Sequence, residues 1–127
     1  MNLKVVINKK EAGIFQVTLF GPLDTLTYSV MEKEIEYILG PTTKAIILNM
    51  EGVNYISSMG IGSVFKLAKT LKSYKGALLI TNLQPQIKKV FDTVKALPEA
   101  IFSSVEEADE YLNEIQKKAM EQDNPSQ

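Results

Sequence analysis

The stretch NYISSMGIGSVF, residues 54–65, places two serines and two glycines between an apolar segment and a segment with helical periodicity. Three kinds of chemistry suit a hydroxyl at such a strand-to-helix turn. Ser57 or Ser58 could cap the helix, a contribution of about 1 kcal/mol to stability. Ser58 could instead act as a nucleophile, or carry a phosphate at the positive end of the helix dipole. The residue pair alone favours the cap.

The composition removes most catalytic chemistry. The 127-residue chain contains no histidine and no cysteine, which excludes thiol nucleophiles, disulfides, Cys/His zinc sites and Ser-His-Asp triads. An enzyme with Ser58 as nucleophile and Lys66 as base remains conceivable. However, the glycines do not match a G-x-S-x-G elbow, and Lys66 lies roughly two helical turns away. We therefore predict a binding protein, not an enzyme, with no metal and no cofactor.

The charge balance excludes other classes of partner. The 14 basic residues are all lysines and are matched by 15 acidic residues. A nucleic-acid binder usually concentrates Arg and Lys on one face, so we expect no nucleic-acid partner. No apolar run approaches the roughly 20 residues of a membrane span. The first ten residues alternate apolar and polar side chains and lack the long apolar centre of a signal peptide. We expect a cytoplasmic protein without membrane insertion.

Apolar periodicity predicts the strands. Residues 3–7 and 15–19 alternate apolar and polar side chains, and Gly13 between them can adopt a positive φ, which predicts an antiparallel hairpin. Residues 45–50 and 77–81 are almost continuously apolar, as in strands buried on both faces. A helix from about residue 58 to 74 separates them, so these two strands should be parallel. Residues 100–102 suggest a short last strand.

Capping and stop signals delimit the other helices. Asp24 or Thr25 in GPLDT can cap a helix that ends at Gly40 and Pro41. A third helix begins near residue 85, and a capping box from residue 104 to 107 opens the last one. The order ββαβαβαβα predicts a single α/β domain. It has a mixed, mostly parallel sheet, an N-terminal antiparallel hairpin and helices packed on the sheet. We expect this domain over residues 1–118 and a flexible tail over 119–127.

The helix after the serines has a defined solvent side. Its apolar positions must pack on the sheet, so a projection at 100° per residue places Met59, Gly62, Ser63 and Lys66 on the opposite side. Glycine in a helix costs roughly 0.8–1 kcal/mol relative to alanine. Gly62 therefore either permits close helix packing or leaves the first turn bare for a docking protein. The sequence leaves these two interpretations equal.

The segment AIILNMEGVNYISSMGIG, together with GPLD at residues 21–24, resembles the signature of the STAS domain, the fold of bacterial anti-sigma factor antagonists. The resemblance covers roughly residues 3–115. Aligned on Gly60, the phosphorylated serine of the family falls on Ser58. Ser57 and Asn49 stand where the family carries acidic residues, so the charge around the acceptor differs.

The resemblance implies a mechanism and a set of partners. The unphosphorylated domain would bind an anti-sigma factor that is itself a serine kinase, and so free a sigma factor. The kinase would phosphorylate Ser58 and end the contact, and a phosphatase would reset the cycle. A homodimer is left open. The expected partner surface consists of Asp24, Thr25, Ser57, Met59, Gly60, Gly62, Ser63 and Lys66.

Two requirements accompany this interpretation. The Ser58 hydroxyl has to stand open to a docking protein, and burial of that oxygen or coverage of the turn by another part of the chain would contradict the signalling account. The alternative is a STAS scaffold without phosphorylation, or a soluble subunit of a signalling complex or lipid-transport system.

Overall fold

A computed structural model describes residues 2–95 and 104–122. Four strands form one sheet in the order β1-β2-β3-β4: β1 (Lys4–Glu11), β2 (Ile14–Phe20), β3 (Ala45–Gly52) and β4 (Ala77–Thr81). β1 and β2 are antiparallel, whereas β2, β3 and β4 run parallel. The predicted mixed sheet with an N-terminal hairpin is confirmed. The predicted strand at 100–102 lies outside the described residues.

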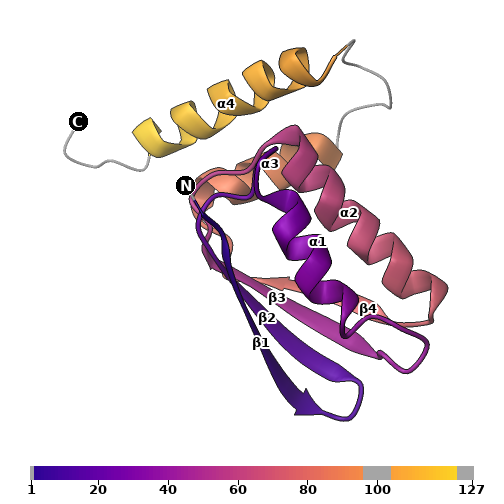
Figure 1. Cartoon of the computed structure of the whole chain (residues 1–127). Helices are drawn as coiled ribbons and strands as arrows, with labels where there is room; N and C mark the ends of the chain where they lie inside the picture. Colours follow the sequence, from indigo (N-terminus) through magenta and orange to yellow (C-terminus); the bar gives the residue numbers. More distant parts are fainter. Residues whose placement is uncertain (1, 96–103, 123–127) are drawn as a thin grey trace.

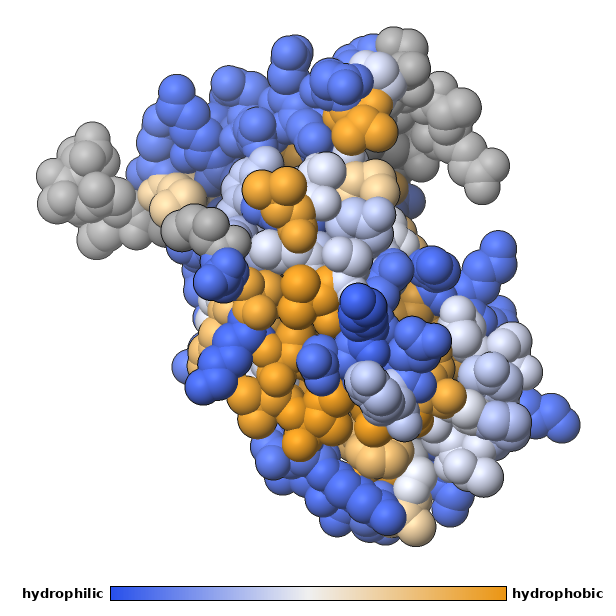
Figure 2. All heavy atoms as spheres, in the orientation of Figure 1, coloured by the Kyte–Doolittle hydropathy of each residue, from blue (hydrophilic) through white to orange (hydrophobic). Residues whose placement is uncertain are grey.

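The helices are α1 (Tyr28–Glu36), α2 (Ser58–Ser73), α3 (Pro85–Lys95) and α4 (Val105–Gln122). Figure 1 shows α1 and α2 side by side on one face of the sheet, with α4 at the end of the domain where both of these helices begin. The face of α4 seen in Figure 2 is mainly hydrophilic. None of the helices in the described part of the chain combines the length and apolar character needed to cross a membrane.

Local signals explain where the elements begin. Gly13 adopts a φ of 80°, as the hairpin required, and Ser104 caps α4 by accepting a hydrogen bond from the Glu107 amide at 3.1 Å. Pro85 opens α3. α4 continues past the predicted domain boundary at residue 118 to Gln122, and Ala119 is buried.

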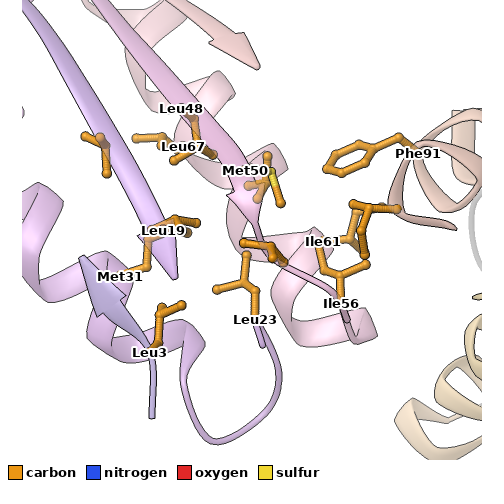
Figure 3. Packing of buried hydrophobic residues seen from close by; sticks show 14 of the residues in the cluster. Leu3, Leu19, Leu23, Met31, Leu48, Met50, Ile56, Ile61, Leu67 and Phe91 are labelled. Carbon is orange, nitrogen blue, oxygen red and sulfur yellow. The ribbon is translucent and has the colours of Figure 1, made fainter. Parts of the chain in front are cut away.

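The hydrophobic core lies between the sheet and the helices. Along β3 the burial alternates, with Ile46, Leu48 and Met50 fully buried against α1 and α2 and with Ile47 only half-buried. Leu79 pairs with Ile47 and is 52% exposed. The prediction that β3 and β4 are buried on both faces is therefore wrong, because their second face is only partly covered. Figure 3 shows this core continuing to Leu23, Ile56, Ile61 and Phe91.

The two glycines of α2 have different surroundings. A Cβ added to Gly60 would lie 2.3 Å from the Leu23 carbonyl oxygen, so α2 packs on the chain there through a bare Cα. A Cβ added to Gly62 would meet nothing within 4 Å. Gly62 is exposed, so close helix packing does not account for it. Of the two interpretations left open, only an accessible first turn agrees with the structure.

Matched alanine substitutions test this difference. Gly62→Ala should stabilise the fold by about 0.8–1 kcal/mol, because alanine is the better helix former and the added methyl group has room. Gly60→Ala should destabilise it by about 1–3 kcal/mol, because the methyl group must displace main chain. Urea unfolding followed by circular dichroism measures both free energies. Equal effects of the two substitutions would show that the surroundings of these glycines do not differ.

Candidate functional site

Main-chain pairing brings the two sequence motifs together. The Leu23 amide donates to the Tyr55 carbonyl at 2.9 Å, and the Ser57 amide donates to the Leu23 carbonyl at 3.0 Å. These bonds form an isolated parallel bridge between Leu23 and Ile56. The GPLD turn and the double-serine turn therefore lie side by side, as expected for segments that follow neighbouring parallel strands.

The GPLD turn is held by its own side chains. The Asp24 carboxylate accepts hydrogen bonds from the amides of Leu26 and Thr27, at 2.9 and 3.1 Å. The Thr27 hydroxyl donates to the Pro22 carbonyl at 2.7 Å. Asp24 thus fixes the turn before α1, whereas Thr27 occupies the N-cap position without a side-chain cap bond into the helix. Thr25 is exposed and takes no part in this hydrogen-bond network.

Of the two serines that the sequence offered as a cap, Ser57 caps α2. Its backbone is extended, with φ −99° and ψ 175°, and its Oγ accepts a hydrogen bond from the Gly60 amide at 3.2 Å. The side chain is consequently inside the structure, with Ser57 only 2% exposed. A buried capping oxygen is unsuited to direct contact with a partner.

Ser58 does not stand open. Its Oγ is buried and has no hydrogen-bond partner among the described residues. Its amide donates to the Asp109 carboxylate of α4 at 2.8 Å. The expectation of an accessible hydroxyl is therefore wrong for this conformation, in which α4 also lies against the turn. The hydroxyl could accept a phosphate only after it has become exposed.

α4 holds the turn through side chains that the sequence analysis did not single out. The Gln116 carboxamide accepts from the Ile56 amide at 3.0 Å and donates to the Ile56 carbonyl at 2.8 Å. The Tyr55 hydroxyl donates to the Asn113 side chain. With Asp109, these residues lie at i, i+4 and i+7, which is one face of a helix. This spacing was visible in the sequence, but a polar stripe usually faces water.

The expected partner surface divides by exposure. Thr25, Gly62 and Lys66 are exposed, and Asp24 and Met59 are half-buried. Ser57, Gly60 and Ser63 are buried.

The projected solvent position of Ser63 is wrong because α1 packs beside α2. The Ser63 Oγ donates to the Glu32 carboxylate of α1 at 2.6 Å. Lys66 Nζ lies 3.8 Å from the same carboxylate, and its side chain remains 72% exposed. A hollow of about 300 Å³ between α1 and α2 is lined by Met59, Gly62 and Lys66, among others.

The electrostatics of the site centre on Tyr55. Burial raises the pKa of the Tyr55 phenol above its ordinary value of 10.0, and the charges of Asp109 and Asp24 raise this pKa further. The folded state thus holds the phenolic proton more tightly than the unfolded state. The resulting stability is complete below about pH 10 and is lost as the pH rises through the folded value.

An alkaline titration tests this arrangement. Tyr55→Phe should remove a component with a pKa above 10.0 from the tyrosine absorbance titration. Asp109→Asn should lower the pKa of that component, because it removes one of the two charges that disfavour the phenolate. Ultraviolet difference spectra against each variant measure both effects. A missing component that titrates at or below 10.0 would contradict the placement of Tyr55 beside the two carboxylates.

Comparisons with known proteins agree with the fold and with the motif. The model of the STAS domain family matches residues 6–108. The anti-sigma F factor antagonist of Lysinibacillus sphaericus is 32% identical over 76 residues, which cover 59% of this chain and 65% of that protein. The anti-sigma-B factor antagonist of Staphylococcus aureus is 26% identical over 92 residues, covering 72% and 84%.

Among solved structures, the anti-sigma factor antagonist SpoIIAA in its unphosphorylated form superposes with a TM-score of 0.61 at 22% identity, over 87% of this chain and 98% of that one. This likeness establishes the fold. The named relatives are antagonists, which are binding regulators, in agreement with the prediction that this chain is not an enzyme. With a matching family model over most of its length, the chain belongs to the STAS domain family.

Proposed function

We propose that this protein is an anti-sigma factor antagonist, which binds an anti-sigma factor through the start of α2. The observation that carries the proposal is the family match over residues 6–108, joined to relatives that are named anti-sigma factor antagonists. The docking surface consists of Asp24, Thr25, Met59, Gly62 and Lys66, which are the exposed or half-buried members of the expected set. Such a contact places the protein in the cytoplasm, where sigma factors act.

Gly62 supports the location of this surface. The glycine weakens α2 by roughly 0.8–1 kcal/mol relative to alanine, yet no neighbouring atom requires it. A partner that approaches the helix backbone closely would explain a missing side chain in the first exposed turn. Lys66 lies one helical turn further along and adds a positive charge that an acidic partner surface could pair with.

The switch would act on Ser58. The anti-sigma factor, as a serine kinase, would transfer the γ-phosphoryl group of ATP to the Ser58 Oγ. A new O–P bond forms, the bond to the β–γ bridging oxygen breaks, ADP leaves, and the hydroxyl proton passes to a base of the kinase. Ser58 would then carry about −1.5 to −2 charges, whose desolvation at an interface is costly. A phosphatase would hydrolyse the ester and restore binding.

The buried Ser58 Oγ makes this switch conditional on a structural change. SpoIIAA, which shares the fold, has solved structures in both its phosphorylated and unphosphorylated forms. The same burial, with Ser57 and Asn49 in place of acidic residues, favours the second candidate function. In that case the domain is a scaffold, or a soluble subunit of a signalling or lipid-transport complex, and Ser58 is never modified.

A binding titration tests the proposed contact. The probe is a serine-kinase anti-sigma factor encoded in the same genome, titrated by calorimetry in the absence of ATP. Ser58→Asp and Gly62→Gln should each weaken binding at least tenfold, because they add charge or bulk at the start of α2. Lys10→Gln, at the hairpin on the opposite end of the sheet, should leave the affinity unchanged.

Intact mass after incubation with this kinase and ATP separates the two candidate functions. One added phosphate, absent from Ser58→Ala, supports the switch. Binding without any added phosphate favours the scaffold. Equal affinities of the parent chain and Gly62→Gln would remove the start of α2 as the docking surface.

A further inference from the structure

An acidic side chain from α4 occupies the positive end of α2. The first turn of α2 contains no acidic residue of its own, so nothing within that helix complements its dipole. The Asp109 carboxylate fills this role by accepting the Ser58 amide hydrogen bond at 2.8 Å. Three covalent bonds separate this amide nitrogen from the Ser58 Oγ. The carboxylate therefore lies beside the place where a phosphate on Ser58 would put its negative charge.

Independent contacts keep α4 in this position. The Gln116 carboxamide pairs with both main-chain groups of Ile56, and Gln116 is 4% exposed. Leu112 is buried between these polar contacts. α4 also packs along α3, as Figure 1 shows. The contact with the turn is thus a built interface with hydrogen bonds and an apolar centre.

The closed arrangement leaves one polar group unsatisfied. The Ser58 Oγ is buried without a hydrogen-bond partner among the described residues, whereas water would satisfy it in an open state. Buried hydroxyl groups normally find a partner. The exception lies at a residue whose own amide is held by α4, so the packing of α4 and the hydration of this hydroxyl oppose each other.

We propose that α4 is an intramolecular latch on the turn that contains Ser58, and that negative charge on Ser58 opens it. In the closed state the Ser58 hydroxyl is buried, and Asp109 supplies an anionic charge at the start of α2. A phosphoryl group on Ser58 would repel the Asp109 carboxylate and displace α4. The role of the latch in signalling rests on the proposed function, whereas its existence does not.

The latch has one consequence for the proposed partner. A kinase can modify Ser58 only in the open fraction of molecules, so the rate of phosphorylation is reduced in proportion to that fraction. The proposed docking surface is exposed or half-buried in the closed state, so the position of α4 leaves the affinity for the anti-sigma factor unchanged. Weakening the latch should therefore raise the rate of phosphorylation without any change in affinity.

The absence of cysteine makes the latch directly measurable. Ser58→Cys introduces a single thiol in place of the hidden hydroxyl, and Gly62→Cys places one in the open space of the same helix. The probe is the thiol reagent DTNB, applied to the full chain. The thiol at position 58 should react at least tenfold more slowly than the one at position 62.

Second substitutions identify α4 as the cause. Asp109→Ala and Gln116→Ala should each speed the reaction at position 58 at least threefold, because each removes a bond between α4 and the turn. Glu110→Ala makes the same truncation at the neighbouring, exposed residue and should have no effect. If the position-58 thiol reacts as fast as the position-62 thiol in the parent background, or if no α4 substitution changes its rate, the latch is overturned.

Amide hydrogen exchange tests the effect of charge without any partner. The Ile56 amide is protected through Gln116, whereas the Ser57 amide is protected through Leu23 and serves as the internal control. Ser58→Asp should accelerate exchange at Ile56 at least tenfold and leave Ser57 unchanged. Ser58→Asn, in which the new side chain has the shape of aspartate without its charge, should not accelerate exchange at Ile56. Adding Asp109→Asn to Ser58→Asp should restore most of the protection of the Ile56 amide.

These outcomes are separable from the fate of the proposed function. Unchanged Ile56 exchange in Ser58→Asp would show that charge does not open α4, whatever the anti-sigma factor does. A latch that passes both measurements in a chain that binds no anti-sigma factor would stand, while the antagonist proposal would fall. If the thiol at position 58 is accessible in a chain that binds the anti-sigma factor and is phosphorylated, the latch would fall and the antagonist proposal would stand.

Discussion

The organisation of the site depends on how the chain around Ile56 is paired. On one side, Tyr55 and Ser57 bond to the main chain of Leu23; on the other, Ile56 bonds through both of its main-chain groups to the Gln116 carboxamide. A side-chain amide thus takes the place of a neighbouring strand. Since buried amides and carbonyls require partners, this pairing fixes where the turn lies, where α2 begins and how α4 is oriented.

The same interactions that assemble the motif also conceal part of it. GPLD and the double-serine turn meet through Leu23, and Gly60 allows α2 to pack directly on the Leu23 carbonyl. Gly62 of the same helix is exposed, with no neighbouring atom near the place of a Cβ. The Asp109 contact, however, holds α4 at the amide of Ser58, whose hydroxyl is buried. Exposed docking surface and hidden acceptor are therefore neighbours on one helix turn, and a change at one position affects the other.

Local chemistry predicted most of the fold, because periodicity, Gly13 and the capping serines act over a few residues. The adjacency of GPLD and the serines agrees with the general rule that neighbouring parallel strands end at the same edge of a sheet. The predictions that were wrong concern residues whose surroundings depend on tertiary packing. Ser63 was projected into solvent because a helical wheel carries no information about α1 beside it. The burial of the Ser58 hydroxyl was missed because it accompanies a contact with Asp109. That residue is fifty-one positions away in the chain, so local patterns do not reveal the contact.

The polar stripe of α4 also constrains how this protein can change in length. Asp109, Asn113 and Gln116 reach the turn together only because they share one angular phase on the helix. Each residue advances an α-helix by about 100°, so a single insertion between Asp109 and Gln116 would swing one end of the stripe away from its contacts. Insertions and deletions that keep the domain intact are therefore confined to positions outside residues 109–116, while substitutions within that span remain tolerable on its outward face.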